Sequence, residues 1–417
     1  MRVGVIWRSA LITACVVQIT LVVVGLVRFG IQGLNIDSLQ QHPATFVLLL
    51  IVPGLGACLS LVLSVVPRIV QINLLLFLSC WVVVEVTFGG INFYRPAVHD
   101  EQEAAAGKMD IYGDDPILGY TLMPNALERH TEEYRGQRIF NVLYETDNEA
   151  RRATPVDSVR PRSQFILFFG DSYTFGWGLR QRQTLPYYVG ELAREYQPYN
   201  YGVSGWGPTQ MLDILKTRDL GREVKQKEGY AVFFLIDDHV GRVIGANFIS
   251  ADWGSHLSHY VLDRSGLPRR EGNFATGRPF TTLFYKLLGW SQVVQYFSLE
   301  LPTHYSDADY RLTAEIIAQS KKILETKFKL DGFFVILSVY AGDANERLAP
   351  YLKQMGVKYL DLRTLYNAQD PLYRISRLDS HNSALANRVT AAAIVKELGI
   401  GEATRPESAE MREPSGR

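Results

Sequence analysis

The stretch Phe165-Ile-Leu-Phe-Phe-Gly-Asp-Ser-Tyr-Thr-Phe-Gly-Trp-Gly178 decides the fold of this chain. Its first five residues are all apolar, which is typical of a strand buried on both faces. A segment with the pattern of a helix follows at residues 184–195. Gly-Asp-Ser therefore occupies the turn that leaves a central strand, and such a turn presents a serine hydroxyl at the end of a sheet. Ser172 is the candidate nucleophile.

Further strand-like runs alternate with helical segments after this stretch. A helix is expected over 307–328, where apolar residues recur at helical spacing. The alternation predicts an α/β fold, with a parallel sheet covered by helices on both faces and the functional site at the carboxyl ends of the strands. The expected strands are 165–169, 199–203, 231–236, 333–339 and 357–360.

The composition excludes several classes of protein. The 417 residues carry 43 basic and 43 acidic side chains, so the net charge of +0 gives no sign of nucleic-acid binding. All three cysteines lie early in the chain, at Cys15, Cys58 and Cys80. The rest of the chain therefore has no disulfide and no thiolate metal site, and we expect neither a metal nor another cofactor.

The first 94 residues hold few charges and predict a membrane anchor. Three transmembrane helices are expected, at about 9–29, 44–66 and 69–93. A signal peptide is the alternative for the first run, but no small-x-small cleavage site follows it. Glu85 interrupts the third run, and we expect it either near the outer interface or in contact with a membrane partner.

The charges between the predicted spans set their orientation. Arg2, Arg8 and Arg68 would lie on one side of the membrane and Arg28 on the other. The positive-inside rule then places the N-terminus in the cytoplasm and the chain after the third span outside it. The expected location is the cell inner membrane, with the catalytic domain in the periplasm.

The remainder of the chain divides into four parts. Residues 95–160 predict a linker and a small β-rich prelude, because turn residues separate short alternating runs. The main domain should span 161–401, with an aromatic-rich insertion at 240–305. Residues 402–417 form a polar tail.

An acid and a base that suit Ser172 occur near the end of the chain, in Leu378-Asp-Ser-His381. A serine hydroxyl is a weak nucleophile until an imidazole takes its proton, and a carboxylate orients that imidazole and stabilises its cation. Asp379 and His381 are two residues apart, so one loop can point both toward Ser172. The three residues form the predicted catalytic triad.

The order of these motifs resembles the SGNH (GDSL-type) hydrolase superfamily over about residues 163–397, and in particular a membrane-anchored bacterial branch. Gly170-Asp-Ser172 is similar to its first block, Asn200-Tyr-Gly-Val-Ser-Gly205 to its second, and Asp379-Ser-His381 to its last. The resemblance implies a three-layer, flavodoxin-like parallel sheet. It also implies an oxyanion hole that includes the backbone N–H groups of Ser172 and Gly205.

The third block departs from the family. An asparagine that normally donates to the oxyanion is expected where this chain has Asp237-Asp-His239. An ionised carboxylate would repel an oxyanion, so His239 is the candidate replacement donor. Alternatively, these three residues cap the strand and bind Arg242. Possible substrate-binding residues around the motifs are Asp171, Trp177, Asn200, Trp206 and Asp237.

These features together predict a membrane-anchored serine esterase that acts outside the cytoplasm. The expected substrate is an O-acyl ester on an envelope glycan or lipid. An O-acyltransferase is the alternative, in which a sugar hydroxyl replaces water and a polytopic membrane partner supplies the acyl group. A non-catalytic binding or scaffold protein with the same fold is a third possibility, for which the altered third block is the main support.

Overall fold

The computed structural model describes residues 68–94, 110–134, 136–157, 161–251 and 253–401. These residues belong to two compact units. One unit contains residues up to Pro96 together with Trp290–Ser298, and the other contains the rest. The predicted spans at 9–29 and 44–66 and the tail at 402–417 lie outside the described residues.

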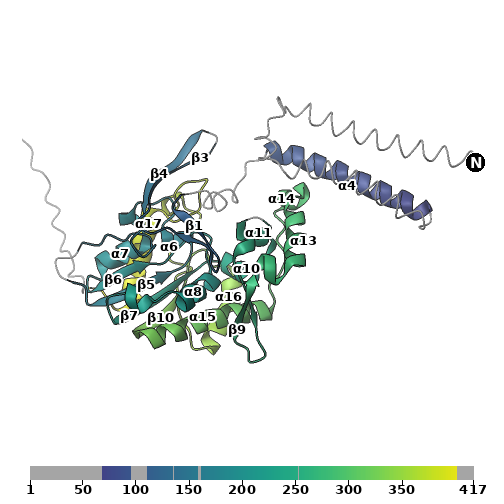
Figure 1. The fold of residues 1–417 in the computed structure, drawn as a ribbon. Helices are drawn as coiled ribbons and strands as arrows, with labels where there is room; N and C mark the ends of the chain where they lie inside the picture. The colour runs from purple at the N-terminus through teal and green to yellow at the C-terminus, as the bar shows by residue number, and fades with distance from the viewer. Residues whose placement is uncertain (1–67, 95–109, 135, 158–160, 252, 402–417) are drawn as a thin grey trace, which may run out of the picture. The chain divides into compact units, whose positions relative to one another are not determined.

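The main unit is built on one five-stranded sheet whose neighbouring strands are all parallel. Helices lie on both faces of this sheet, so the α/β arrangement that the sequence predicted is present (Figure 1). In spatial order the strands are β11 (Lys358–Asp361), β10 (Lys329–Leu337), β7 (Glu228–Leu235), β5 (Gln164–Phe169) and β6 (Tyr196–Asn200).

Alternate residues of the central strands point to opposite faces of the sheet and into two separate cores. In β5, Phe165, Leu167 and Phe169 pack on one face, while Ile166 and Phe168 pack on the other. Every one of these five side chains is at most 1% exposed, which explains why β5 has no polar residue after Gln164. The first face is covered by α8 (Pro208–Thr217), α15 (Asp307–Lys327) and α16 (Asp343–Gln354), and the second by α7 (Leu185–Leu192) and α17 (Ala384–Leu398).

The predicted strand at 199–203 is placed too late. The observed strand β6 covers Tyr196–Asn200 and includes Pro198. Proline lacks a backbone N–H and is tolerated on an edge strand, and β6 lies at the edge of the sheet. The strand ends at Asn200 because the Asn200 Oδ1 accepts a hydrogen bond from the Gly202 N–H, which turns the chain away. Beyond β6, the backbone of Arg152 forms an isolated antiparallel bridge with Asn200.

Two antiparallel hairpins precede the sheet in the region of the predicted prelude. Their strands are β1 (Tyr112–Asp115) with β2 (Gly119–Leu122), and β3 (Leu127–Tyr134) with β4 (Gln137–Glu145). Short helical turns complete the main unit: α6 (Ser172–Phe175), η2 (Gln181–Gln183), α9 (Leu220–Glu223) and η4 (Pro371–Tyr373).

The predicted insertion is a set of short elements that follows β7. It comprises α10 (Asp238–Ile244), α11 (Asn247–Ser250), η3 (Trp253–His256), β8 (Ser258–Leu262), β9 (Pro268–Asn273), α12 (Phe274–Gly277) and α13 (Pro279–Gly289). β8 and β9 form an antiparallel hairpin. The Tyr260 hydroxyl of this hairpin donates to Asp213 Oδ1 of α8 at 2.6 Å, which ties the insertion to the helices over the sheet.

The second unit consists of α4 (Arg68–Tyr94) and α14 (Gln292–Phe297), which are distant in sequence. The Glu85 carboxylate accepts 2.6 Å hydrogen bonds from the Ser291 hydroxyl and the Gln292 N–H. The Phe88 ring lies 4.7 Å from the Tyr296 ring. Glu85 therefore binds the start of α14 of its own chain, a contact that the sequence did not predict.

A helix does form over the predicted third span at 69–93. Across the described ranges, however, no helix combines the length and the apolar character that a membrane crossing needs. Asn73, Glu85 and Asn92 interrupt the apolar run. The prediction of a span at this position is therefore not supported.

The hydrogen bond between Tyr260 and Asp213 gives a test of how the insertion is held. Asp213 is buried, and burial raises its pKa although hydrogen bonds and nearby cations oppose that rise. Tyr260→Phe removes the hydroxyl that donates to Asp213 Oδ1, so this buried acceptor loses that donor. We expect Tyr260→Phe to lower the free energy of unfolding by about 1–3 kcal/mol, measured by urea denaturation. Tyr188→Phe is the control, because the Tyr188 hydroxyl makes no hydrogen bond to any described residue. An equal effect of the two substitutions would contradict this role of Tyr260.

Candidate active site

The candidate nucleophile lies on the turn that leaves β5. Gly170 has a φ of +152°, and a Cβ at this position would come within 2.3 Å of the Thr174 Oγ1, so only glycine fits without a shift. Asp171 then caps α6 by accepting the Tyr173 N–H on its Oδ1 at 3.0 Å. These two contacts place Ser172 at the first residue of α6, where its side chain is buried and the residue is 1% exposed.

The structure brings the three predicted triad residues together. His381 Nε2 lies 2.8 Å from Ser172 Oγ, and His381 Nδ1 lies 2.7 Å from Asp379 Oδ1. The same carboxylate oxygen also accepts the backbone N–H of His381 at 2.9 Å. Asp379 thus binds both the backbone and the ring of His381 across a turn of two residues. These two contacts fix the orientation of the imidazole toward Ser172.

The electrostatics of the triad favour an ionised acid. Burial alone would raise the pKa of Asp379, which is 0% exposed. Attraction to His381 and the two hydrogen bonds from that residue outweigh burial, so the pKa of Asp379 lies below its usual value. The carboxylate therefore accepts the Nδ1–H of His381, which leaves Nε2 to accept the proton of Ser172.

Two backbone N–H groups are available as oxyanion donors. Within the described part of the chain, neither the Ser172 N–H nor the Gly205 N–H donates a hydrogen bond. Gly205 has a φ of +78°, in the left-handed region that favours glycine, and a Cβ there would meet the Tyr120 Oη at 2.3 Å and Trp253 at 2.9 Å. Only glycine fits this turn without a shift, and its N–H can donate to a bound ligand.

His239, the predicted replacement oxyanion donor, is fully buried and in contact with the protein's own polar groups, which does not favour that role. The side chain is 0% exposed, its Nδ1 accepts the Ile236 N–H at 3.2 Å, and its Nε2 faces Asp171 Oδ2 at 3.4 Å. Because Nδ1 must carry a lone pair to accept that N–H, the imidazole is neutral, with its one proton on Nε2 directed at Asp171. Nδ1 is therefore used by the protein itself, and Nε2 is buried beside Asp171 without a hydrogen bond of good geometry to any described residue. The alternative, in which this segment binds Arg242, agrees better with the structure, since Arg242 Nη2 lies 3.4 Å from Asp238 Oδ2.

The residues suggested for substrate binding mostly have structural contacts. Asn200 donates to the Thr174 carbonyl at 2.9 Å and accepts the Gly202 N–H, so its amide joins β6 to the nucleophile turn. Trp206 donates from Nε1 to the Tyr120 carbonyl at 3.2 Å. The Asp237 carboxylate lies against Gly342, where a Cβ would come 2.2 Å from Asp237 Oδ2.

Trp177 is a suggested residue whose ring lies beside the triad histidine. Its ring centroid is 6.1 Å from that of His381 and 5.9 Å from that of Phe140, and the residue is 2% exposed. Tyr173 lies closer, with its ring centroid 4.8 Å from that of His381, and the Tyr340 ring packs against Tyr173 at 4.5 Å with a tilt of 45°. Aromatic rings therefore surround the imidazole. Sequence reasoning missed Tyr173 and Tyr340, although Tyr173 directly follows the nucleophile.

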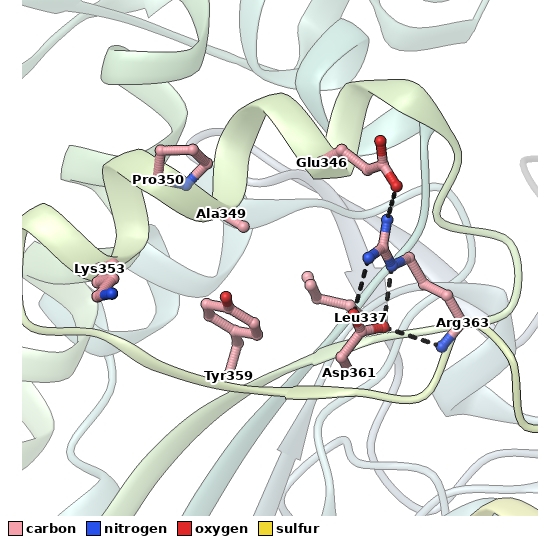
Figure 2. Close-up of a pocket in the computed structure, with 8 residues that line it drawn as sticks. All are labelled: Leu337, Glu346, Ala349, Pro350, Lys353, Tyr359, Asp361 and Arg363. Atoms are coloured by element: carbon pink, nitrogen blue, oxygen red, sulfur yellow. Dashed lines mark hydrogen bonds and ion pairs between the residues drawn. The ribbon is translucent and has the colours of Figure 1, made fainter.

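A hollow of about 440 Å³ lies beside the edge strand β11, between α16 and β11. Figure 2 shows Arg363 at one end of it, bound to Glu346 and Asp361, with Lys353 and Tyr359 at the other. Its charged residues are partly paired with each other, and no triad residue lines it. Nor do the described residues contain a cluster of three or more His, Cys, Asp or Glu side chains arranged as a metal site.

Comparison with known proteins gives only distant likenesses. No family model and no curated protein matches the chain. Among solved structures, a member of the lipolytic G-D-S-L family from Veillonella parvula is 12% identical, with a TM-score of 0.32, over 56% of this chain and 97% of that one. A catalytic mutant of an acetylxylan esterase from Geobacillus stearothermophilus is 12% identical, with a TM-score of 0.32, over 58% and 97%. At such identities and TM-scores these likenesses assign no activity, and the site rests on its own geometry.

The neutral state of His239 predicts a pH dependence of stability. Burial lowers the pKa of His239 and outweighs the attraction of Asp171, which would raise that pKa. Between about pH 6.5 and the lower folded-state pKa, the unfolded chain binds a proton that the folded chain does not. The free energy of unfolding should therefore fall as the pH is lowered from about 7 to 5, by at most about 1.4 kcal/mol per pH unit from this group.

Denaturation at several pH values tests this dependence. His239→Asn keeps an acceptor for the Ile236 N–H but cannot be protonated, so its stability should fall less steeply than that of the wild type. His304→Asn, at an exposed histidine, is the control and should follow the wild-type slope. Identical slopes for all three proteins would show that His239 is not held neutral.

Proposed function

We propose that this chain is a serine esterase of the SGNH type. The observation that supports the proposal is the continuous relay of hydrogen bonds from Asp379 through His381 to Ser172. A buried carboxylate, an imidazole and a serine hydroxyl in this order perform nucleophilic attack on an acyl carbon. The two backbone N–H groups of Ser172 and Gly205 are donors of the kind that stabilise the negative charge that forms on the carbonyl oxygen.

The proposed reaction passes through an acyl-enzyme. Ser172 Oγ attacks the ester carbonyl carbon while His381 Nε2 takes the hydroxyl proton. The tetrahedral intermediate then collapses, the ester C–O bond breaks, and His381 returns the proton to the leaving alkoxide. Water repeats the sequence, giving up a proton to His381 as it attacks the acyl carbon, and the proton returns to Ser172 when the acid leaves.

The surroundings of the triad favour a short acyl group. Ser172 is 1% exposed, and the rings of Tyr173 and Trp177 lie beside His381. This crowding leaves little room for a long chain, so an acetyl or similarly small ester suits the site. An O-acyl group on an envelope glycan or lipid is the proposed natural substrate.

The test of the proposed activity is covalent labelling. A fluorophosphonate probe should label the wild-type protein, and Ser172→Ala should abolish labelling because the attacking oxygen is removed. His381→Gln should reduce labelling and the hydrolysis of p-nitrophenyl acetate by at least about 10³-fold. Ser204→Ala is the control, since this buried serine lies four residues after the end of β6 and outside the triad. Labelling that survives Ser172→Ala would rule the proposal out.

Acyl transfer remains the second candidate reaction. Ser172 is 1% exposed, so a sugar acceptor bound over it would exclude bulk water from the acyl-enzyme. A sugar hydroxyl delivered by the substrate would then compete with water, and a polytopic membrane partner would supply the acyl donor. Product analysis with and without an acceptor glycan separates the two reactions.

We further propose that the catalytic unit lies outside the cytoplasm, attached to the inner membrane. The support comes from the sequence: the uncharged runs at 9–27 and 43–67, the arginines that place the N-terminus in the cytoplasm, and the lack of any cysteine after Cys80. Because two crossings would return the chain to the cytoplasm, the proposed location requires a third crossing at 69–93. A reporter fused after Gly401 that works only outside the cytoplasm should be active. Activity of a cytoplasm-specific reporter at the same position would overturn the proposed location.

A further inference from the structure

A single buried arginine reaches two of the loops that form the candidate site. Arg242 lies on α10, the helix that directly follows β7, and is 1% exposed. Its Nη1 lies 3.1 Å from Asp171 Oδ2 and donates to the Trp206 carbonyl at 2.9 Å. Asp171 directly precedes Ser172, and Trp206 directly follows Gly205. One guanidinium nitrogen therefore links the residues that adjoin both candidate oxyanion donors.

The contacts of Arg242 cross three neighbouring strand ends. Asp171 belongs to the turn after β5, Trp206 to the turn after β6, and Arg242 itself to the helix after β7. The Val203 N–H already donates to the Gly170 carbonyl at 3.3 Å, and the guanidinium adds a second link between the first two turns because it binds both at once. A planar guanidinium has several fixed donors, whereas an ammonium is a point charge on a flexible stem.

The charge of Arg242 also matters for the reaction. Burial would raise the pKa of Asp171, but the interactions with His239 and Arg242 outweigh it and keep this carboxyl ionised. An uncompensated negative charge one residue before Ser172 would oppose the oxyanion that forms there. His239 is neutral, so Arg242 supplies the positive charge that balances Asp171.

We infer that Arg242 is a positioning residue for the reaction: it holds the Ser172 and Gly205 N–H groups in a common geometry and offsets the charge of Asp171 beside them. This inference rests on the proposed esterase function. Arg242 itself does not contact the reacting atoms, so its effect is expected on the stabilisation of the transition state and not on the binding of substrate.

Arg152 offers a matched control. It is also 1% exposed, and it donates to the carbonyls of Glu145 and Leu179 without contacting the triad or the Gly205 turn. Replacing either arginine by lysine removes a buried guanidinium and keeps a cation. Any loss of activity that comes only from a disturbed fold should therefore appear in both variants.

The experiment compares Arg242→Lys with Arg152→Lys in the hydrolysis of p-nitrophenyl acetate. We expect Arg242→Lys to lower kcat by about 10- to 100-fold and to change KM by less than about twofold. This decrease in kcat is smaller than the decrease that follows removal of a direct oxyanion donor. The affinity for a boronic acid, which mimics the tetrahedral intermediate, should fall by the same factor as kcat/KM. Arg152→Lys should lower kcat no more than about threefold.

A second variant covers the case in which Arg242→Lys folds poorly. Asp171→Asn with Arg242→Met removes both members of the buried ion pair, so no unpaired buried charge remains; Asp238, the other partner of Arg242, is half exposed. We expect this double variant to fold, with thermal unfolding as the check, and to stay at least about tenfold below the wild-type kcat. Full turnover in the double variant overturns the positioning role.

The outcomes separate this inference from the proposed function. If the wild type is not labelled by the fluorophosphonate and hydrolyses no ester, the esterase proposal and the role of Arg242 fall together. If the wild type is active and the two Arg→Lys variants lose equal activity, only the role of Arg242 is overturned.

Discussion

The hydrogen bond between His381 Nε2 and Ser172 Oγ joins groups that are 209 residues apart in the chain. It depends on the parallel order of the sheet, because parallel strands end at a common edge and the loops that follow them meet there. β5 delivers Ser172 to this edge, the turn after β6 delivers Gly205, and the loop before α17 delivers Asp379 and His381. A strand of opposite direction at any of these positions would carry its loop to the far edge and separate the groups.

Much of this arrangement could be predicted from the sequence, since the signals were local. The unbroken apolar run of β5 identified a strand buried on both faces, and Gly-Asp-Ser identified the turn after it. The spacing of Asp379 and His381 predicted a shared loop because two residues are enough for one turn. Pro198 hid the start of β6, since proline is rare in strands and only the edge position, a tertiary property, permits it.

The direction of buried polar side chains could not be predicted in the same way. His239 and Asn200 were assigned to ligand binding on residue type. In the structure, His239 is fully buried and its Nδ1 accepts a backbone N–H, and the Asn200 amide is used by hydrogen bonds within the protein. A buried polar atom must find a partner or lose the free energy of hydration, and the partner comes from a strand or turn elsewhere in the sequence. Glu85 is a similar case: its apolar surroundings suggested lipid, but its partners lie on α14, more than 200 positions later.

The two edges of the sheet have a further consequence, for the behaviour of the protein at high concentration. An exposed strand edge offers unpaired N–H and C=O groups to other chains and is a common start of aggregation. On one side, β6 contains Pro198, which has no N–H to offer, and its last residue is already bridged by Arg152. On the other side, β11 is only four residues long and begins with Lys358. Neither edge is a good template for a foreign strand, so the sheet is protected from edge-to-edge association by its own sequence.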